Sequence, residues 1–167
     1  MIHRILRSLT TWPDRRGWLK CLAVSLVTAL SVAGLGVAGA LIHWQPHVDG
    51  WGLRLISVLC IPAFSEELVF RGALVPDDKD IQQPVIWIGA AVVTFMLWHV
   101  VEATLLLPNA RLFLQPVFLV CAGLLGLGCA IMRYRTGSLW PSVFLHAALV
   151  WIWQTWLGGP DIAQLMR

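Results

Sequence analysis

The chain has 167 residues, of which 58% are hydrophobic and only 13% charged, and its mean hydropathy is +0.75. Soluble domains carry about 25% charged residues, so this composition excludes an ordinary soluble globular protein and predicts an integral membrane protein in a lipid bilayer. The net charge of +3 is small, and no basic patch with interleaved aromatic residues occurs, so we expect no nucleic acid partner.

Apolar runs follow a short basic segment at the N-terminus. Residues 1–17 contain Trp12 and several arginines, and we expect them to lie along the cytoplasmic surface of the membrane. A membrane-spanning helix needs about 20 apolar residues, and residues 18–167 supply such runs without any linker long enough to divide them into domains. The expected fold is all-α, a polytopic transmembrane helix bundle of about five spans in one domain. The expected spans are 18–42, 52–75, 84–107, 112–132 and 139–157.

The Lys and Arg residues are distributed unevenly between the two sides of this bundle. Nine fall on the side of the N-terminus and three on the other side. Because cytoplasmic connections are enriched in positive charge, we expect the N-terminus to be cytoplasmic. The nine are Arg4, Arg7, Arg15, Arg16, Lys20, Arg71, Lys79, Arg133 and Arg135, and the three are Arg54, Arg111 and Arg167.

The second predicted span contains three charged residues, Glu66, Glu67 and Arg71. A charge at the centre of a membrane costs about 2.5–3.5 kcal/mol on insertion scales, so such residues indicate a functional site. On a helix, Glu67 and Arg71 share a face and favour an ion pair, whereas Glu66 is rotated by about 100° and remains available as an acid or base. Pro62, one turn earlier, predicts a kink. The alternative is that all three charges form one packing network.

Two histidines lie in later apolar runs, His99 in the third predicted span and His146 in the fifth. Either one alone could be a buried residue with a satisfied hydrogen bond. Counted from the cytoplasmic ends at 1.5 Å per residue, Glu66, His99 and His146 lie at depths of roughly 14, 22 and 11 Å, so they can converge. Glu102 follows His99 by three residues and could orient its ring or be an ordinary solvated residue. The convergence indicates proton-transfer chemistry inside the membrane.

Three motifs occur in order along the chain. They are Glu66-Glu67-x-x-x-Arg71, Phe95-x-x-x-His99, and His146 after Gly137-Ser138-Leu139-Trp140-Pro141. Their order and spacing, over about residues 55–157, resemble those of the CPBP family of intramembrane proteases, the CAAX-prenyl-endopeptidase-like and bacteriocin-processing proteins.

This resemblance implies a role for each site residue and a protease-like identity for the domain at 18–167. Glu66 would be the catalytic glutamate that activates water, supported by Glu67 and Arg71. His99 and His146 would hold the water and stabilise the oxyanion. The substrate would be a membrane-associated protein or peptide with a C-terminal sorting tail or a CAAX-like end, reached laterally or from the cytoplasmic face, in a bacterial inner membrane.

We expect a glutamic mechanism with no cofactor. Zinc is the alternative, because two His and one Glu can form a zinc site with an open position. Glu66 would then be a ligand, and no obvious separate base would remain.

One position departs from the family pattern. Four residues after the last histidine the family usually has Asn, whereas this chain has Val150, so one donor to the oxyanion is absent or comes from Gln154 or Asn109. This departure supports a rival function, a non-catalytic immunity or scaffold protein that binds a partner transmembrane helix. A proton or ion pathway is a further alternative, but it needs polar residues in both leaflets, and the span at 112–132 is nearly free of them.

Overall fold

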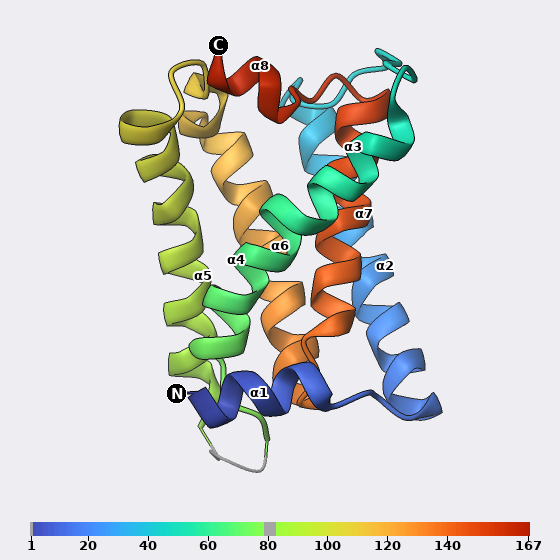
Figure 1. The fold of residues 1–167 in the computed structure, drawn as a ribbon, viewed down its shortest axis with the longest axis vertical. Coiled ribbons are helices and arrows are strands. Elements are labelled where there is room, and N and C mark those ends of the chain that lie inside the picture. The colour runs from blue at the N-terminus through green and yellow to red at the C-terminus, as the bar shows by residue number, and fades with distance from the viewer. Residues whose placement is uncertain (1, 79–82) are drawn as a thin grey trace.

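The computed structural model describes residues 2–78 and 83–167 and shows a bundle of helices (Figure 1). All regular secondary structure in these two ranges is helical, apart from one isolated bridge between Gln45 and Leu157. The prediction of an all-α fold is therefore confirmed. Lys79, which contributed to the charge count, lies outside the described residues.

Within residues 2–78 and 83–167, three helices are long and apolar enough to cross a membrane, judged by length and composition. They agree with the predicted first, third and fourth spans. A fourth helix, α7 at Trp140–Trp156, has 17 residues and corresponds to the predicted last span. The number of five spans remains a prediction. The three long segments are α2 (Arg15–Ala38), α5 (Pro84–Val101) with its π-helical continuation η3 (Glu102–Leu106), and α6 (Pro116–Thr136).

The predicted second span is not one continuous α-helix. Ile61 has φ −140° and ψ 115°, an extended conformation that breaks the helix directly before Pro62. Proline has no N–H to donate and its ring clashes with the preceding turn, so the predicted kink at Pro62 is confirmed. The segment consists of α3 (Trp51–Val58), η1 (Leu59–Phe64), α4 (Ser65–Glu67) and η2 (Leu68–Ala73), of which η1 and η2 are π-helical. Both glutamates lie on the three-residue α4.

The N-terminal segment forms a helix, α1 (Ile2–Thr10), which lies across one end of the bundle (Figure 1). Arg7 of α1 forms an ion pair with Asp77, with Nη2 and Oδ2 2.8 Å apart. The backbone N–H of Leu139 donates to the carbonyl oxygen of Ser8 at 2.9 Å. These contacts attach α1 to the ends of two segments, η2 and α7, that carry predicted site residues.

The opposite end of the bundle contains the remaining connections. Here Gln45 pairs with Leu157, and the N–H of Asn109 donates to the carbonyl oxygen of Leu165 at 3.2 Å. Leu165 belongs to the short helix α8 (Ile162–Met166), which lies over this end (Figure 1). The connections thus alternate between the two ends, as the predicted spans require.

One part of the charge count was wrong. Arg71 was placed beside a connection, but its side chain is fully buried within the bundle. It therefore does not contribute to the orientation. Arg133 is also fully buried, so the bias becomes seven to three. The bias still favours a cytoplasmic α1.

Helix α6 is the centre of the packing, in contact with α2, α5 and α7. A Cβ atom on Gly126 would lie 2.8 Å from Nη2 of Arg71 and 3.1 Å from the ring of Phe95. Only glycine therefore allows α6 to approach the charged segment this closely. This close approach encloses Arg71 between η2, α5 and α6.

Candidate active site

The two glutamates of α4 are both buried, with Glu66 7% exposed and Glu67 fully enclosed. They lie between two π-helical stretches, a local geometry that is frequent at functional sites. Consecutive residues on a helix point about 100° apart, so the two carboxylates have different neighbours. The structure separates them as the sequence predicted.

Glu67 belongs to a closed network. Its Oε1 accepts a hydrogen bond from Nη1 of Arg71 at 3.0 Å, and neither side chain is exposed. The guanidinium carbon of Arg71 lies 4.1 Å from the ring centroid of Phe95, within range of a cation–π contact. The predicted Glu67–Arg71 ion pair is therefore confirmed, and Arg71 neutralises the charge of this carboxylate.

His146 connects this network to Glu66. Its Nδ1 lies 2.9 Å from the same Oε1 of Glu67. Because a carboxylate paired with Arg71 can only accept, Nδ1 is the donor, and in the tautomer with one ring proton Nε2 is an acceptor. This Nε2 lies 3.8 Å from Oε2 of Glu66, too far for a direct hydrogen bond.

His99 is held in the same tautomer by the backbone. Its Nδ1 lies 2.9 Å from the carbonyl oxygen of Phe95, which can only accept, so Nδ1 donates and Nε2 is an acceptor. The ring also makes edge-to-face contacts with Phe95, Phe113 and Phe118, with centroid distances between 4.7 and 5.5 Å. Packing on three sides fixes the direction of the imidazole.

Glu66 is the incompletely paired acid of the site. Its Oε1 accepts a hydrogen bond from Nε1 of Trp98 at 3.3 Å, and its Oε2 is buried without a hydrogen-bond partner among the described residues. Atoms of Glu66, His99 and Glu102 that could ligate a metal lie within 4.8 Å of one another. Glu66 thus lies close to His99 on one helix and to His146 on another, and Glu102 adds a second carboxylate beside it.

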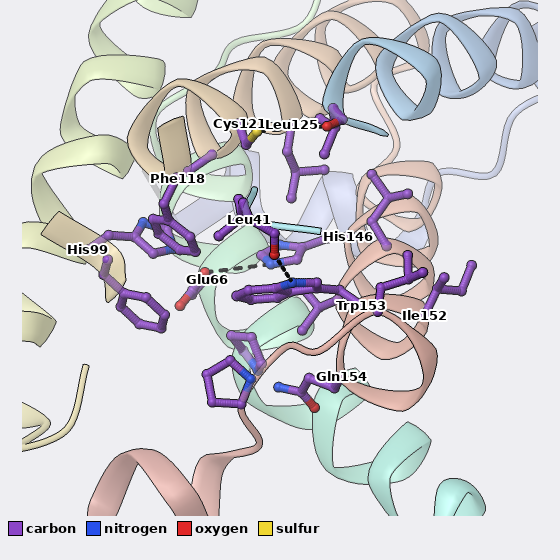
Figure 2. A pocket seen from close by; sticks show the side chains of 18 of the residues that line it. Leu41, Glu66, His99, Phe118, Cys121, Leu125, His146, Ile152, Trp153 and Gln154 are labelled. Carbon is purple, nitrogen blue, oxygen red and sulfur yellow. Dashed lines mark hydrogen bonds and ion pairs between the residues drawn. The ribbon is translucent and has the colours of Figure 1, made fainter. Parts of the chain in front are cut away.

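These side chains line a cavity of about 670 Å³. In Figure 2 one of the two dashed lines joins Glu66 to His146, and His99 lies on the other side of Glu66. The rest of the lining is mainly apolar and comes from α2, α5, α6, α7 and the segments at the end of the bundle remote from α1. A partly paired carboxylate and two ring acceptors facing an apolar space are suited to hold and activate one water molecule.

The other predicted contributors differ in position. Val150 and Gln154 line the cavity, and Gln154 is 7% exposed, so its amide remains a possible donor to an oxyanion. Asn109 lies at the outer end of the bundle and does not belong to the lining. No sequence motif indicated that Trp98 donates to Glu66, or whether Glu102 orients the His99 ring or is simply solvated. The only sequence signal is that Trp98 and Glu102 are four residues apart along α5 and η3, which places them on one face.

A metal ion also fits the donor set. Glu66, His99 and Glu102 provide one imidazole nitrogen and two carboxylates, which are zinc ligands by type. Metal-bound histidines usually donate their second nitrogen to a carbonyl or carboxylate, as His99 and His146 do here. Geometry alone is therefore compatible with water held by protein side chains and with water held by zinc.

The family model described as type II CAAX prenyl endopeptidase Rce1-like matches residues 48–152. The chain belongs to this family. The matched range covers more than half of the chain and contains Glu66, Glu67, Arg71, His99 and His146. No curated protein and no solved structure matches the chain. The family is one of CAAX-type intramembrane proteases, and together with the apolar helices it supports an integral membrane protein with peptidase activity.

Proposed function

We propose that this protein is an intramembrane endopeptidase of the glutamic type, which hydrolyses a peptide bond near the membrane in a membrane-associated protein. The observation that carries the proposal is the arrangement of Glu66. It is buried, unpaired at Oε2, and lies opposite the acceptor Nε2 of His146 at 3.8 Å. A buried carboxylate without a cationic partner of its own can accept a proton and act as a general base.

The reaction begins with a water molecule held between Glu66, His99 and His146. Both histidines present Nε2 as an acceptor, but a water molecule has only two hydrogen atoms. It therefore donates one to Glu66 and the other to Nε2 of one histidine, which orients it. Glu66 removes one proton as the water oxygen attacks the scissile carbonyl carbon, and it then passes that proton to the leaving amine as the C–N bond breaks. The atoms balance without another reactant.

The tetrahedral oxyanion needs hydrogen-bond donors, and a single donor is typically worth about 2.7–4 kcal/mol in the transition state. A neutral imidazole with its proton on Nδ1 cannot donate through Nε2, so His99 or His146 would stabilise the oxyanion only after gaining a second proton. The N–H of Trp98, near Glu66, and the amide of Gln154, in the cavity wall, are further donors. These groups would compensate for the apolar side chain of Val150.

Glu67 and Arg71 act on the position of His146 and not on the substrate. The hydrogen bond from Nδ1 of His146 to Glu67 fixes the tautomer and direction of the ring, and Arg71 holds the same oxygen of Glu67 in place by donating a second hydrogen bond to it. This is the support that the family resemblance implies for both residues.

We favour the metal-free reaction because it leaves Glu66 free to act as the base. If zinc is bound, Glu66, His99 and Glu102 would hold it, and it would supply a Lewis acid that polarises water or the scissile carbonyl. Metal analysis of the purified protein, with and without chelator, distinguishes the two versions. Activity without bound metal supports the glutamic type, and stoichiometric zinc that is lost together with activity contradicts it.

The substrate that we propose is a protein with a C-terminal sorting tail or a CAAX-like end, in a bacterial inner membrane. Two probe peptides test this class. One has a Leu/Ala helix of membrane-spanning length followed by arginines, and the other has a farnesylated CAAX terminus. Purified protein in detergent should cleave at least one of them.

Glu66→Gln should abolish this cleavage and leave the unfolding midpoint unchanged, because Gln has the same shape but cannot accept a proton. Asp78→Asn, the same chemical change at an exposed position that lines neither cavity, should have no effect. Full cleavage by Glu66→Gln would refute the assigned base. Absence of cleavage by the unaltered protein, with tight binding of the helical peptide, would favour the scaffold function instead.

A further inference from the structure

We propose that substrate and water reach Glu66 from the side of the membrane opposite α1, with a lateral opening toward lipid, and not from the cytoplasmic side. This inference rests on the proposed peptidase function and specifies its substrates. They would be exported polypeptides whose apolar segment already lies in the membrane.

The α1 end of the bundle is closed by direct contacts. Nη1 of Arg4 donates to the carbonyl oxygen of Ala73 at 3.2 Å, and Nε1 of Trp140 donates to that of Leu9 at 2.9 Å. The rings of Trp12 and Trp140 stack with their centroids 5.4 Å apart. Helix α1 is thereby fixed to the end of η2 and to the start of α7.

A packed apolar layer lies beneath α1. Ala63, Leu139 and Val143 are fully buried in one core cluster, and Leu9 of α1 packs against it. Ser8, also on α1, has no exposed surface. Access to Glu66 through this end would require α1 to detach and this layer to open.

The cavity occupies the other half of the bundle. Its lining residues begin at Leu26 on α2, at Phe95 on α5 and at His146 on α7, and continue toward the ends remote from α1. Helix α6 runs in the opposite direction, and its lining residues end at Leu125. Glu66 therefore lies near the inner limit of the cavity, and the free space extends outward from it.

A polar route meets the cavity at its outer end. Gln154 lines both the large cavity and a second, polar cavity of about 180 Å³. The second cavity also includes Arg54 of α3, and Asp49 and Asp161 of the connections at the end remote from α1. Polar groups on this side provide a path for water, which hydrolysis consumes.

An apolar opening faces the lipid. Leu26, Leu30 and Ile61 line the cavity while being 55%, 73% and 58% exposed, so they form its rim. An apolar rim disfavours a charged peptide and accepts an apolar segment already in the bilayer. The basic residues concentrated around α1 place the closed end in the cytoplasm, so the open half faces the other compartment. This reverses the expected access from the cytoplasmic face and retains lateral access.

Cysteine labelling tests the direction of access without requiring turnover. In a chain whose four cysteines are replaced by alanine, Val150→Cys places a thiol in the cavity wall and Thr10→Cys places one on the exposed surface of α1. A charged, membrane-impermeant methanethiosulfonate is added to right-side-out and to inside-out vesicles. We expect Val150→Cys to react only in the vesicle type in which Thr10→Cys does not react.

Reaction of both thiols from the same side would overturn the proposal. So would protection of Val150→Cys from both sides while membrane-permeant N-ethylmaleimide still labels it. If the chain without cysteines does not fold, only the exposed Cys60 and the cavity-lining Cys121 are replaced. The two remaining thiols are buried, so we expect the reagent not to label them. Failure here would leave the result of Glu66→Gln intact, so the two proposals fail separately.

Discussion

Glu66 and Glu67 are neighbours in the chain, yet they belong to halves of the bundle with opposite character. In the half of the bundle nearer α1, called the inner half, Glu67 is bound by Arg71 and His146, and α6 packs closely against them at Gly126. In the half remote from α1, called the outer half, Glu66 faces a cavity, and its Oε2 has no hydrogen-bond partner among the residues that the structure describes. A step of one residue around a helix thus separates a carboxylate paired within the bundle from one that faces the cavity.

The difference shows how a membrane protein can bury two neighbouring carboxylates. A buried charge is costly, and the inner half limits that cost by pairing Glu67 with Arg71 and placing the guanidinium over the ring of Phe95. The stable inner half then fixes α4, which carries Glu66 into the outer half. Variants that damage one half and not the other can test this division.

Replacing Arg71 by Met should produce the largest loss of stability. Removal of one member of a buried ion pair leaves the other charge uncompensated, which costs about 3–5 kcal/mol. Denaturant unfolding in detergent measures the loss. Arg111→Met at an exposed outer position is the matched control and should change the free energy of unfolding by less than about 0.5 kcal/mol. Equal effects of the two variants would contradict a special role of the inner half.

Gly126→Ala should have the next largest effect on stability. The added Cβ would lie 2.8 Å from Nη2 of Arg71 and 3.1 Å from the ring of Phe95, so the inner network must move. Overpacking of this kind costs about 1–3 kcal/mol. Gly89→Ala is the control, because nothing lies within 4 Å of its Cβ position, and it should be neutral or slightly stabilising. A neutral Gly126→Ala would show that the inner half is not tightly packed.

Much of this architecture follows from the sequence, because burial of charge in a membrane leaves a strong signal. The predicted spans at 18–42 and 84–107 nearly coincide with Arg15–Ala38 and Pro84–Leu106. The Glu67–Arg71 pair followed from spacing on one helix, since residues four apart share a face. The predicted continuous span at 52–75 proved to be segmented, with the break at the expected proline.

The remaining features depend on distances between helices, which spacing along one helix does not determine. The bond from His146 to Glu67 joins two helices, and so does the bond from Trp98 to Glu66. The outward position of the cavity depends on how α1 docks and where the helices diverge. The depth estimates allowed Glu66, His99 and His146 to meet, but only tertiary packing brings them together.

Arg7→Gln tests the closed end and should have a smaller effect. The ion pair between Arg7 and Asp77 is 2.8 Å long, but the arginine side chain is 45% exposed. Exposed pairs contribute about 0.2–1 kcal/mol, and α1 keeps its other contacts, so activity should persist. Arg16→Gln, at an exposed position in the first turn of α2, is the control. A loss as large as that of Arg71→Met would make α1 part of the structural centre instead of a cover.

Ala29→Phe should change stability least and still impair activity. Ala29 lines the cavity on α2, where the free volume of about 670 Å³ can accept a phenyl ring without displacing a neighbour, so the free energy of unfolding should change by less than about 0.5 kcal/mol. The ring would occupy space that the substrate needs, and the KM for the helical probe peptide should rise. Ala90→Phe, on the exposed surface of α5, adds the same ring outside the cavity and should change neither quantity. If Ala29→Phe destabilised the protein as much as Gly126→Ala, the outer half would be packed like the inner half, and the contrast between Glu66 and Glu67 would need another cause.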